Sequence, residues 1–359
     1  MRKIYFTTGP TELNPEIKSF IAEAIENDIC SINHRSIKFV DICKDTVKSL
    51  KALLNIPDNY HVFFLASATE CMDKIITNCV ETCSLHFVNG AFAERFYKIA
   101  LELNKKAQNI EIPYGESFKF NKLKLKRTPE LICITHNETS TGVTIDTDEI
   151  YKLRKGFPES LIAVDVVTSV PYYNLDFSKI DCAFFSVQKG FGLPPGLAVL
   201  IVNDKCIEKV QHIKNSKKNI GSYHNFISLY ENSLKNQTTE TPNTLGIFLL
   251  GKVCEYLINY SIELIRQETE VKSEMIYDFF EMSALGTPFI RNVKDRSKTV
   301  IVIDLNEKQN EIIKLLEENG IIVSTGYRNY KNTQIRIANF PQHKTEDVKR
   351  MLEILSTVK

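Results

Sequence analysis

Short runs of strand length alternate with segments of helical period between residues 61 and 202 of this 359-residue chain. Helical spacing is clearest at residues 69–80, 92–103 and 148–154. Alternation of this kind is typical of a mostly parallel sheet with helices on both faces, which predicts an α/β fold. The predicted strands are residues 61–66, 85–88, 109–113, 131–135, 161–166, 182–185 and 197–202.

The pattern changes towards the C-terminus. Residues 203–241 are polar, with one helix predicted near residues 226–234. A long helical pattern follows at residues 245–280, with a break near Tyr260. Three short strands and two helices then predict a smaller α+β domain. We expect residues 14–244 to form the large domain, and residues 1–13 and 245–359 to form the small one.

Composition excludes several classes of protein. The net charge is +1 without a long run of one sign, which argues against nucleic acid as the principal partner. No apolar run approaches the ~18 residues of a membrane span. The nine cysteines include no CxxC pair, so no zinc ribbon or other metal site is predicted. The first residues turn to threonine, glycine and proline too early for a signal peptide, and we expect a reduced, cytoplasmic protein.

Lys189 stands between two apolar runs, beside Gly190, Gly192 and Gly196. Lysine is costly to bury, so this one is either a solvated loop residue or a reactive amine. The glycines also invite comparison with a dinucleotide-binding fingerprint. That motif needs a helix after it, and residues 197–202 form a second run of strand length instead.

Polar residues lie at or just after the ends of five of the predicted strands, at the edge where ligands bind in open parallel sheets. Each residue has an ordinary explanation beside a functional one. Ser67 or Thr69 suits a helix N-cap or a phosphate site, and Asp165 suits a structural acid or a catalytic one. His136 suits an ordinary loop position, and the Asn137–Thr139 run suits a local turn. Phe92 suits a position in the core. The five groups are residues 67–69, 89–92, 136–139, Asp165 and residues 187–189.

A phosphate cradle, an acid, a lysine and an aromatic ring together suit pyridoxal phosphate. Its aldehyde forms a Schiff base with a lysine, and its pyridine nitrogen needs an anionic partner. Asp165 would supply that charge, and Phe92 would stack on the ring. Thr139 would bond the phenolic oxygen. Lys189 would serve as the base that moves a proton from the substrate Cα.

These motifs resemble those of the class V, fold-type I pyridoxal-phosphate aminotransferases, and most of all their phosphoserine aminotransferase branch. The resemblance covers nearly the whole chain and implies a mostly parallel seven-stranded sheet. The motifs are FTTGPTELNPEI, NHRSIKF, ASATE, VNGAFAERF, HNETSTGV, the Asp165-to-Lys189 segment, TETPNTL and YRNYKNTQIRIANFP.

The resemblance also implies roles for single residues. Ala68, Thr69 and Gln188 would bind the cofactor phosphate, joined by Thr241 from the partner chain of a homodimer. Thr8 and Gly9 would lie by the substrate, and Arg336 would bind the substrate α-carboxylate. His34, Arg35 and Arg328 would meet a distal phosphate or carboxylate.

The implied reaction converts 3-phosphohydroxypyruvate and L-glutamate to O-phospho-L-serine and 2-oxoglutarate, in serine biosynthesis. Three departures bear on the substrate. Phe92 stands where the branch usually has tryptophan, SATE replaces a glycine-rich phosphate loop, and Tyr327 replaces a histidine. Class V enzymes acting on serine, alanine or 2-aminoethylphosphonate therefore stay open as alternatives, as does a catalytically silent relative.

Overall fold

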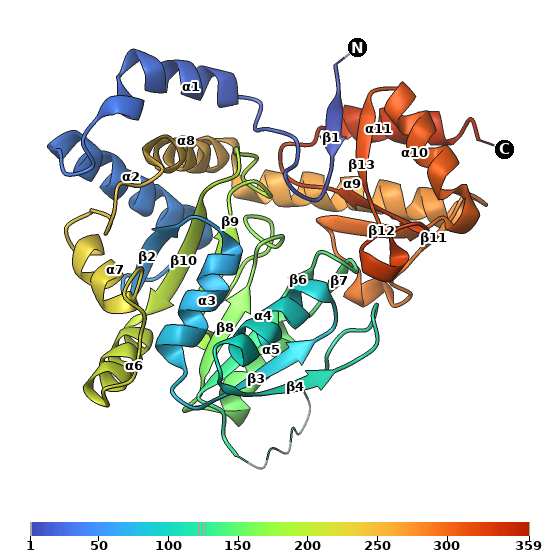
Figure 1. Ribbon diagram of the computed structural model, residues 1–359. Helices are drawn as coiled ribbons and strands as arrows, with labels where there is room; N and C mark the ends of the chain where they lie inside the picture. Colours follow the sequence, from blue (N-terminus) through green and yellow to red (C-terminus); the bar gives the residue numbers. More distant parts are fainter. Residues whose placement is uncertain (1, 121–122, 124, 126, 359) are drawn as a thin grey trace.

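Seven strands form the larger of the two main sheets in this computed structural model, which describes residues 2–120, 123, 125 and 127–358 (Figure 1). Strand β10 runs antiparallel to both of its neighbours, and the other pairs are parallel. The predicted mostly parallel, seven-stranded sheet is therefore confirmed. In spatial order its strands are β2 (Tyr60–Leu65), β10 (Ala198–Asn203), β9 (Cys182–Ser186), β8 (Leu161–Asp165), β5 (Leu131–Thr135), β3 (Cys83–Val88) and β4 (Lys106–Glu111).

Helices cover both faces of this sheet, which explains why its strands are continuously apolar. Successive side chains of a strand point to opposite faces. Phe185 packs in a cluster with residues of α2, α5 and α8, whereas Phe184 packs in a cluster with residues of α3, α4 and α6. The helices of this part are α1 (Ile17–Glu26), α2 (Ile37–Leu54), α3 (Ala68–Cys79), α4 (Ala91–Glu102), α5 (Thr147–Gly156), α6 (Asp204–Asn215), α7 (Phe226–Ser233) and α8 (Thr244–Tyr260).

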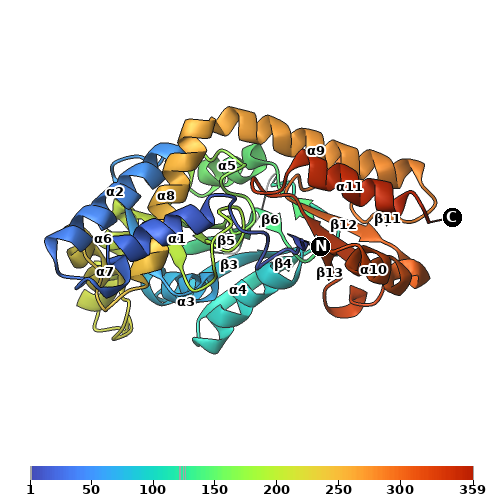
Figure 2. The same ribbon diagram turned by 90° about the horizontal axis from the view of Figure 1, so that it is seen from above.

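A second, five-stranded sheet combines the start of the chain with its end. Strand β1 (Ile4–Phe6) pairs in parallel with β13 (Ile321–Thr325), so the N-terminal residues lie beside the C-terminal part (Figure 1). The long helix α9 (Ile262–Met282) runs from the large sheet towards this second one (Figure 2). The remaining elements are β1 (Ile4–Phe6), β13 (Ile321–Thr325), β14 (Gln334–Ala338), β12 (Val300–Asp304), β11 (Thr287–Pro288), α10 (Gln309–Glu318) and α11 (Thr345–Leu355), with a small hairpin of β6 (Asn137–Glu138) and β7 (Val143–Thr144).

The predicted break near Tyr260 is confirmed. Ser261 has a φ of 82° there, and the axes of α8 and α9 differ by 84°. Over the described residues, no single helix has the length and apolar character needed to cross a membrane, and this bent pair meets that test only jointly, by length and composition.

Helix α1 begins at Ile17, because the Asn14 side chain accepts the Glu16 amide and closes a turn ahead of the helix. One local prediction was wrong. Helix α6 lies in residues 203–241, where only the helix near residues 226–234 was predicted. Its buried residues Cys206, Val210 and Ile213 do follow helical spacing, but the surrounding lysines and glutamates mask that short stripe.

Candidate active site

The Lys189 amine lies at the carboxyl end of β9, against the N-terminal segment. Its Nζ donates a hydrogen bond to the Thr8 carbonyl oxygen at 2.6 Å. A Cβ on Gly9 would lie 2.0 Å from that Nζ, so only glycine leaves room for the amine. The structure therefore brings together Lys189, Thr8 and Gly9, which the sequence analysis assigned to one site.

Burial is the main cause that lowers the pKa of Lys189, to about 8. The positive charge of Arg336 lowers it further, and Asp165 partly offsets both effects. Near neutral pH a useful fraction of the amine is thus uncharged, which a nucleophile or base requires. The unfolded chain holds more protons than the folded one between about pH 8 and 10.5, so this group makes folding more favourable as pH rises through that window.

We expect Lys189 of the cofactor-free protein to react with an amine-acylating reagent with a midpoint near pH 8. The measurement is the rate of labelling at Lys189 by peptide mass spectrometry, from pH 6 to 11. A short lysine-containing peptide in the same reaction provides the reference, since a free lysine amine has a pKa of about 10.4. A Lys189 midpoint equal to that of the reference peptide would contradict the depressed pKa.

Asp165 ends strand β8 and is 3% exposed. Burial raises the pKa of its carboxyl to about 7, against the amide hydrogen bond from Val167 (2.9 Å). The negative charge of Glu138 raises the pKa further, and Lys189 lowers it. A cationic group placed beside this carboxyl would bring the pKa down again and be stabilised in return.

An aromatic pair and an arginine form one wall of the site. The rings of Phe92 and Tyr327 lie 5.5 Å apart at a tilt of 38°, and the Arg336 guanidinium lies 5.2 Å from the Tyr327 ring centre. Arg336 is 9% exposed, and it donates hydrogen bonds to the carbonyl oxygens of Thr325 and Thr139. Phe92 is only partly buried, which leaves part of its ring open to a ligand.

The start of α3 forms a second wall. Ser67 is an ordinary N-cap, because its Oγ accepts the Glu70 amide. The Ala68 amide donates to Ser186 Oγ at 3.0 Å, which fixes the helix start against the end of β9. Ala68 and Thr69 thus lie at the positive end of a helix dipole, which suits a phosphate.

Several residues to which the sequence analysis gave no individual role hold this site together. Glu138 is fully buried and accepts the amides of Phe92 and Ala93, so it anchors the start of α4. Thr168 Oγ1 lies 3.1 Å from Thr139 Oγ1, and the Gln342 amide donates to the Lys189 carbonyl. Glu138 is the one acidic residue of the HNETSTGV motif, and that position is a sequence signal that could have pointed to it.

Two predicted site residues make their contacts elsewhere. The Arg35 guanidinium donates to the Gln237 side chain and to the Thr238 carbonyl, and His34 Nδ1 lies 3.4 Å from Thr241 Oγ1. Within this subunit their hydrogen bonds therefore connect the start of α2 to residues 237–241. Arg328 is closer to the aromatic wall, where it pairs with Glu94 on α4.

The donor set fits pyridoxal phosphate. Buried polar atoms at the carboxyl ends of three strands lack a partner within the described part of the chain. They are both amide atoms of Asn89, Thr135 Oγ1 and Gln188 Oε1. Unpaired buried polar atoms are rare in proteins and call for an unseen partner. When bound, the cofactor supplies an aldehyde for amines and an electron-accepting ring.

Comparisons with known proteins agree with this chemistry. The family model for aminotransferase class-V matches residues 6–351. A phosphoserine aminotransferase of Rhodococcus opacus is 26% identical over 357 residues, which span 98% of this chain and 94% of that protein. The crystal structure of a phosphoserine aminotransferase from Cytophaga hutchinsonii is 44% identical, with a TM-score of 0.97 and 99% of each chain covered. An aspartate aminotransferase from Thermus thermophilus shares the fold, with a TM-score of 0.86 at 20% identity and 99% of this chain and 98% of that chain covered.

A lysine, a buried acid and a helix N-terminus at one edge of a mostly parallel sheet define a fold-type I enzyme dependent on pyridoxal phosphate. Strand β10 directly follows the glycines after Lys189, which rules out the dinucleotide fingerprint. The chain belongs to the class V aminotransferases. It is a pyridoxal-phosphate-dependent transaminase, whose substrates are amino acids and 2-oxo acids.

Proposed function

We propose that this enzyme interconverts 3-phosphohydroxypyruvate plus L-glutamate with O-phospho-L-serine plus 2-oxoglutarate. The observation that carries the proposal is a pair of arginines on one wall of the site. Tyr327 contacts Arg336 on one side, and the next residue in the chain is Arg328. Two guanidinium groups suit a substrate with a carboxylate at one end and a phosphate or second carboxylate at the other.

In this proposal Arg336 binds the substrate α-carboxylate. It is nearly buried and its Nε already donates to the Thr325 carbonyl, so the guanidinium has a fixed direction. A fixed guanidinium fork is suited to a carboxylate because both oxygens are bound at once. Lys189 then accepts the proton at Nζ from the substrate Cα, and Asp165 holds a proton on the pyridine nitrogen.

Arg328 binds the distal anion. Its partner within the chain is Glu94, which also pairs with Lys98 one turn further along α4. An anionic substrate group would compete with that carboxylate for Arg328. A neutral side chain such as that of alanine gains nothing from the exchange, so the pair favours doubly anionic substrates.

The active form is a cytoplasmic homodimer in which each subunit completes the site of the other. Thr241 is exposed, and together with His34 and Arg35 it lies at the 237–241 segment. These residues would face the partner's cofactor phosphate and the substrate's distal anion. The similarity to the phosphoserine aminotransferase of Cytophaga hutchinsonii over 99% of both chains supports the substrate. We also propose that residues 14–244 form the large domain, and that residues 1–13 and 245–359 together form the small one.

We expect Arg328→Ala to lower kcat/KM for phosphoserine by about 10- to 100-fold, while kcat/KM for alanine changes by less than about threefold. The reason is that one charged hydrogen-bond partner contributes about 1.5–3 kcal/mol, and each 1.4 kcal/mol is tenfold. The measurement is a donor panel of phosphoserine, serine, alanine and 2-aminoethylphosphonate.

Glu94→Gln is the matched variant, because it removes the competing carboxylate and leaves Arg328 in place. We expect it to raise kcat/KM for phosphoserine by about two- to tenfold, in the opposite direction to Arg328→Ala. Arg35→Ala tests the contribution of the turn before α2 in the same panel. Equal losses for alanine and phosphoserine in Arg328→Ala and Arg35→Ala would refute the distal-anion role and favour another class V substrate.

A further inference from the structure

His224 lies just before α7, is 3% exposed and is held between two carboxylates. Its Nδ1 is 2.6 Å from Glu70 Oε1, and its Nε2 is 2.6 Å from Glu240 Oε2. A neutral imidazole has only one N–H, so two carboxylate acceptors require the charged form. Burial opposes that charge, but the hydrogen bonds and charges of Glu240 and Glu70 raise the pKa of His224 to about 9.

The two carboxylates belong to parts of the chain that the proposed site uses. Glu70 lies in the first turn of α3, where its Oε2 accepts the Ala66 amide at 2.8 Å. Glu240 directly precedes Thr241, and its carbonyl accepts from Thr238 Oγ1 at 2.7 Å. His224 therefore bridges the helix start that carries Ala68 and Thr69 to the segment that carries Thr241.

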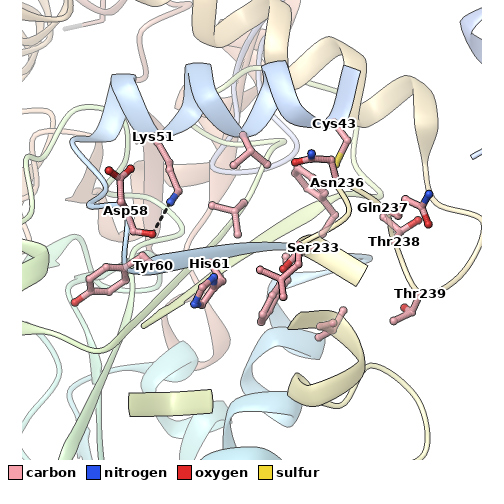
Figure 3. Close-up of a pocket in the computed structure, with 16 residues that line it drawn as sticks. Cys43, Lys51, Asp58, Tyr60, His61, Ser233, Asn236, Gln237, Thr238 and Thr239 are labelled. Carbon is pink, nitrogen blue, oxygen red and sulfur yellow. Dashed lines mark hydrogen bonds between the residues drawn. The ribbon is translucent and has the colours of Figure 1, made fainter. Parts of the chain in front are cut away.

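A cavity of about 240 Å³ borders that segment. It is lined by Ser233 and residues 236–239, and by the α2 side chains of Cys43 and Lys51 (Figure 3). Side-chain bonds connect the segment to the elements around it. Arg35 provides one such set from the turn before α2, and the carboxylate–imidazolium–carboxylate bridge provides the other.

We propose that His224 is a positioning residue for the cofactor phosphate: the Glu70–His224–Glu240 bridge holds the start of α3 and the Thr241 segment in the arrangement that receives the phosphate. The inference rests on the phosphate-binding roles given above to Ala68, Thr69 and Thr241. The imidazolium also neutralises one of two carboxylates beside an anion site. In the proposed dimer, Ala68 and Thr69 would bind the cofactor phosphate of their own subunit, and Thr241 would bind that of the partner. One bridge would therefore connect the two phosphate sites.

The test compares binding of pyridoxal phosphate with binding of pyridoxal, which lacks the phosphate. Cofactor-free His224→Gln is titrated with each compound, and dissociation constants are obtained from fluorescence quenching. We expect the constant for pyridoxal phosphate to rise about 10- to 100-fold, as for loss of a charged hydrogen-bond partner, and the constant for pyridoxal to change less than about twofold. Equal weakening of both compounds, or of neither, would overturn the positioning role.

His86→Gln is the matched control, since His86 is also a buried histidine, lies on β3 and is bonded to Ser84 Oγ at 2.9 Å. We expect it to lower the unfolding temperature without changing the ratio of the two dissociation constants. If His224→Gln does not fold, Glu240→Gln carries the same test, because that carboxylate is only partly buried.

The double variant Glu70→Gln/Glu240→Gln tests whether the three residues act as one unit. We expect the ratio of its dissociation constants for pyridoxal phosphate and pyridoxal to match that of either single variant. Breaking one end of the bridge already releases the segment. Additive losses would show that each carboxylate acts alone. The readout uses no amino donor, so a failed donor panel leaves this result standing, and a failed bridge leaves the proposed reaction standing.

Discussion

Replacing Lys189 by alanine should reduce the rate of transamination by at least about 10³-fold. Two contributions are lost together. In the proposed mechanism the amine would be the nucleophile for the cofactor aldehyde, and a positioned base alone contributes about 10² to 10⁴. The measurement is kcat for the overall reaction, combined with the visible absorption of the protein with added cofactor. A Lys189→Ala enzyme that turns over normally would refute the assignment.

Lys272 provides a matched control for that experiment. It is also a buried lysine, its Nζ donates to the His343 carbonyl at 2.6 Å, and burial likewise lowers its pKa to about 8. It lies on α9, outside the wall formed by Phe92, Tyr327 and Arg336. We expect Lys272→Met to lower thermal stability while kcat per folded enzyme changes by less than about fivefold. Added methylamine should restore part of the activity of Lys189→Ala only, because a small amine can enter the space left by that side chain.

The sheet and the position of the site could be predicted because local patterns determine both. Continuous apolar strands require two covered faces, and parallel strands bring their carboxyl ends to one edge. The residues at that edge, which include Asp165 and Lys189, therefore lie near one another independently of the loop conformations. The same logic failed for α6, where a stripe of three apolar residues on a strongly charged helix gave too weak a signal.

The supporting contacts could not be predicted, because they join residues far apart in sequence. His224 and Glu70 are separated by 154 positions, and Arg328 and Glu94 by 234. Neither pair follows a spacing rule, since both depend on how loops pack after the sheet has formed. The tight fit of Gly9 against Lys189 is of the same kind. Sequence patterns thus predict the reactive groups, whereas the groups that orient them appear only in three dimensions.

Replacing Asp165 by asparagine should lower kcat by about 10² to 10³-fold, the effect of removing one preorganised charge from an active site. Asparagine keeps the shape and can still accept the Val167 amide, so the backbone at the end of β8 should not move. What it loses is the negative charge that would keep the pyridine nitrogen protonated. Lys189 remains, so the variant should still take up the cofactor, which its visible absorption would report.

The same substitution should stabilise the cofactor-free protein, and this opposite sign makes the prediction specific. Burial raises the pKa of Asp165 to about 7 from an ordinary value of 3.8, so the folded chain holds an extra proton between these values. That stabilising contribution is present at low pH and is lost as pH rises through about 7. Cofactor-free Asp165→Asn should therefore unfold a few degrees above the unmodified protein at pH 8 and close to it at pH 4. A variant that loses stability at pH 8 would mean that Asp165 is a structural acid satisfied by its protein contacts.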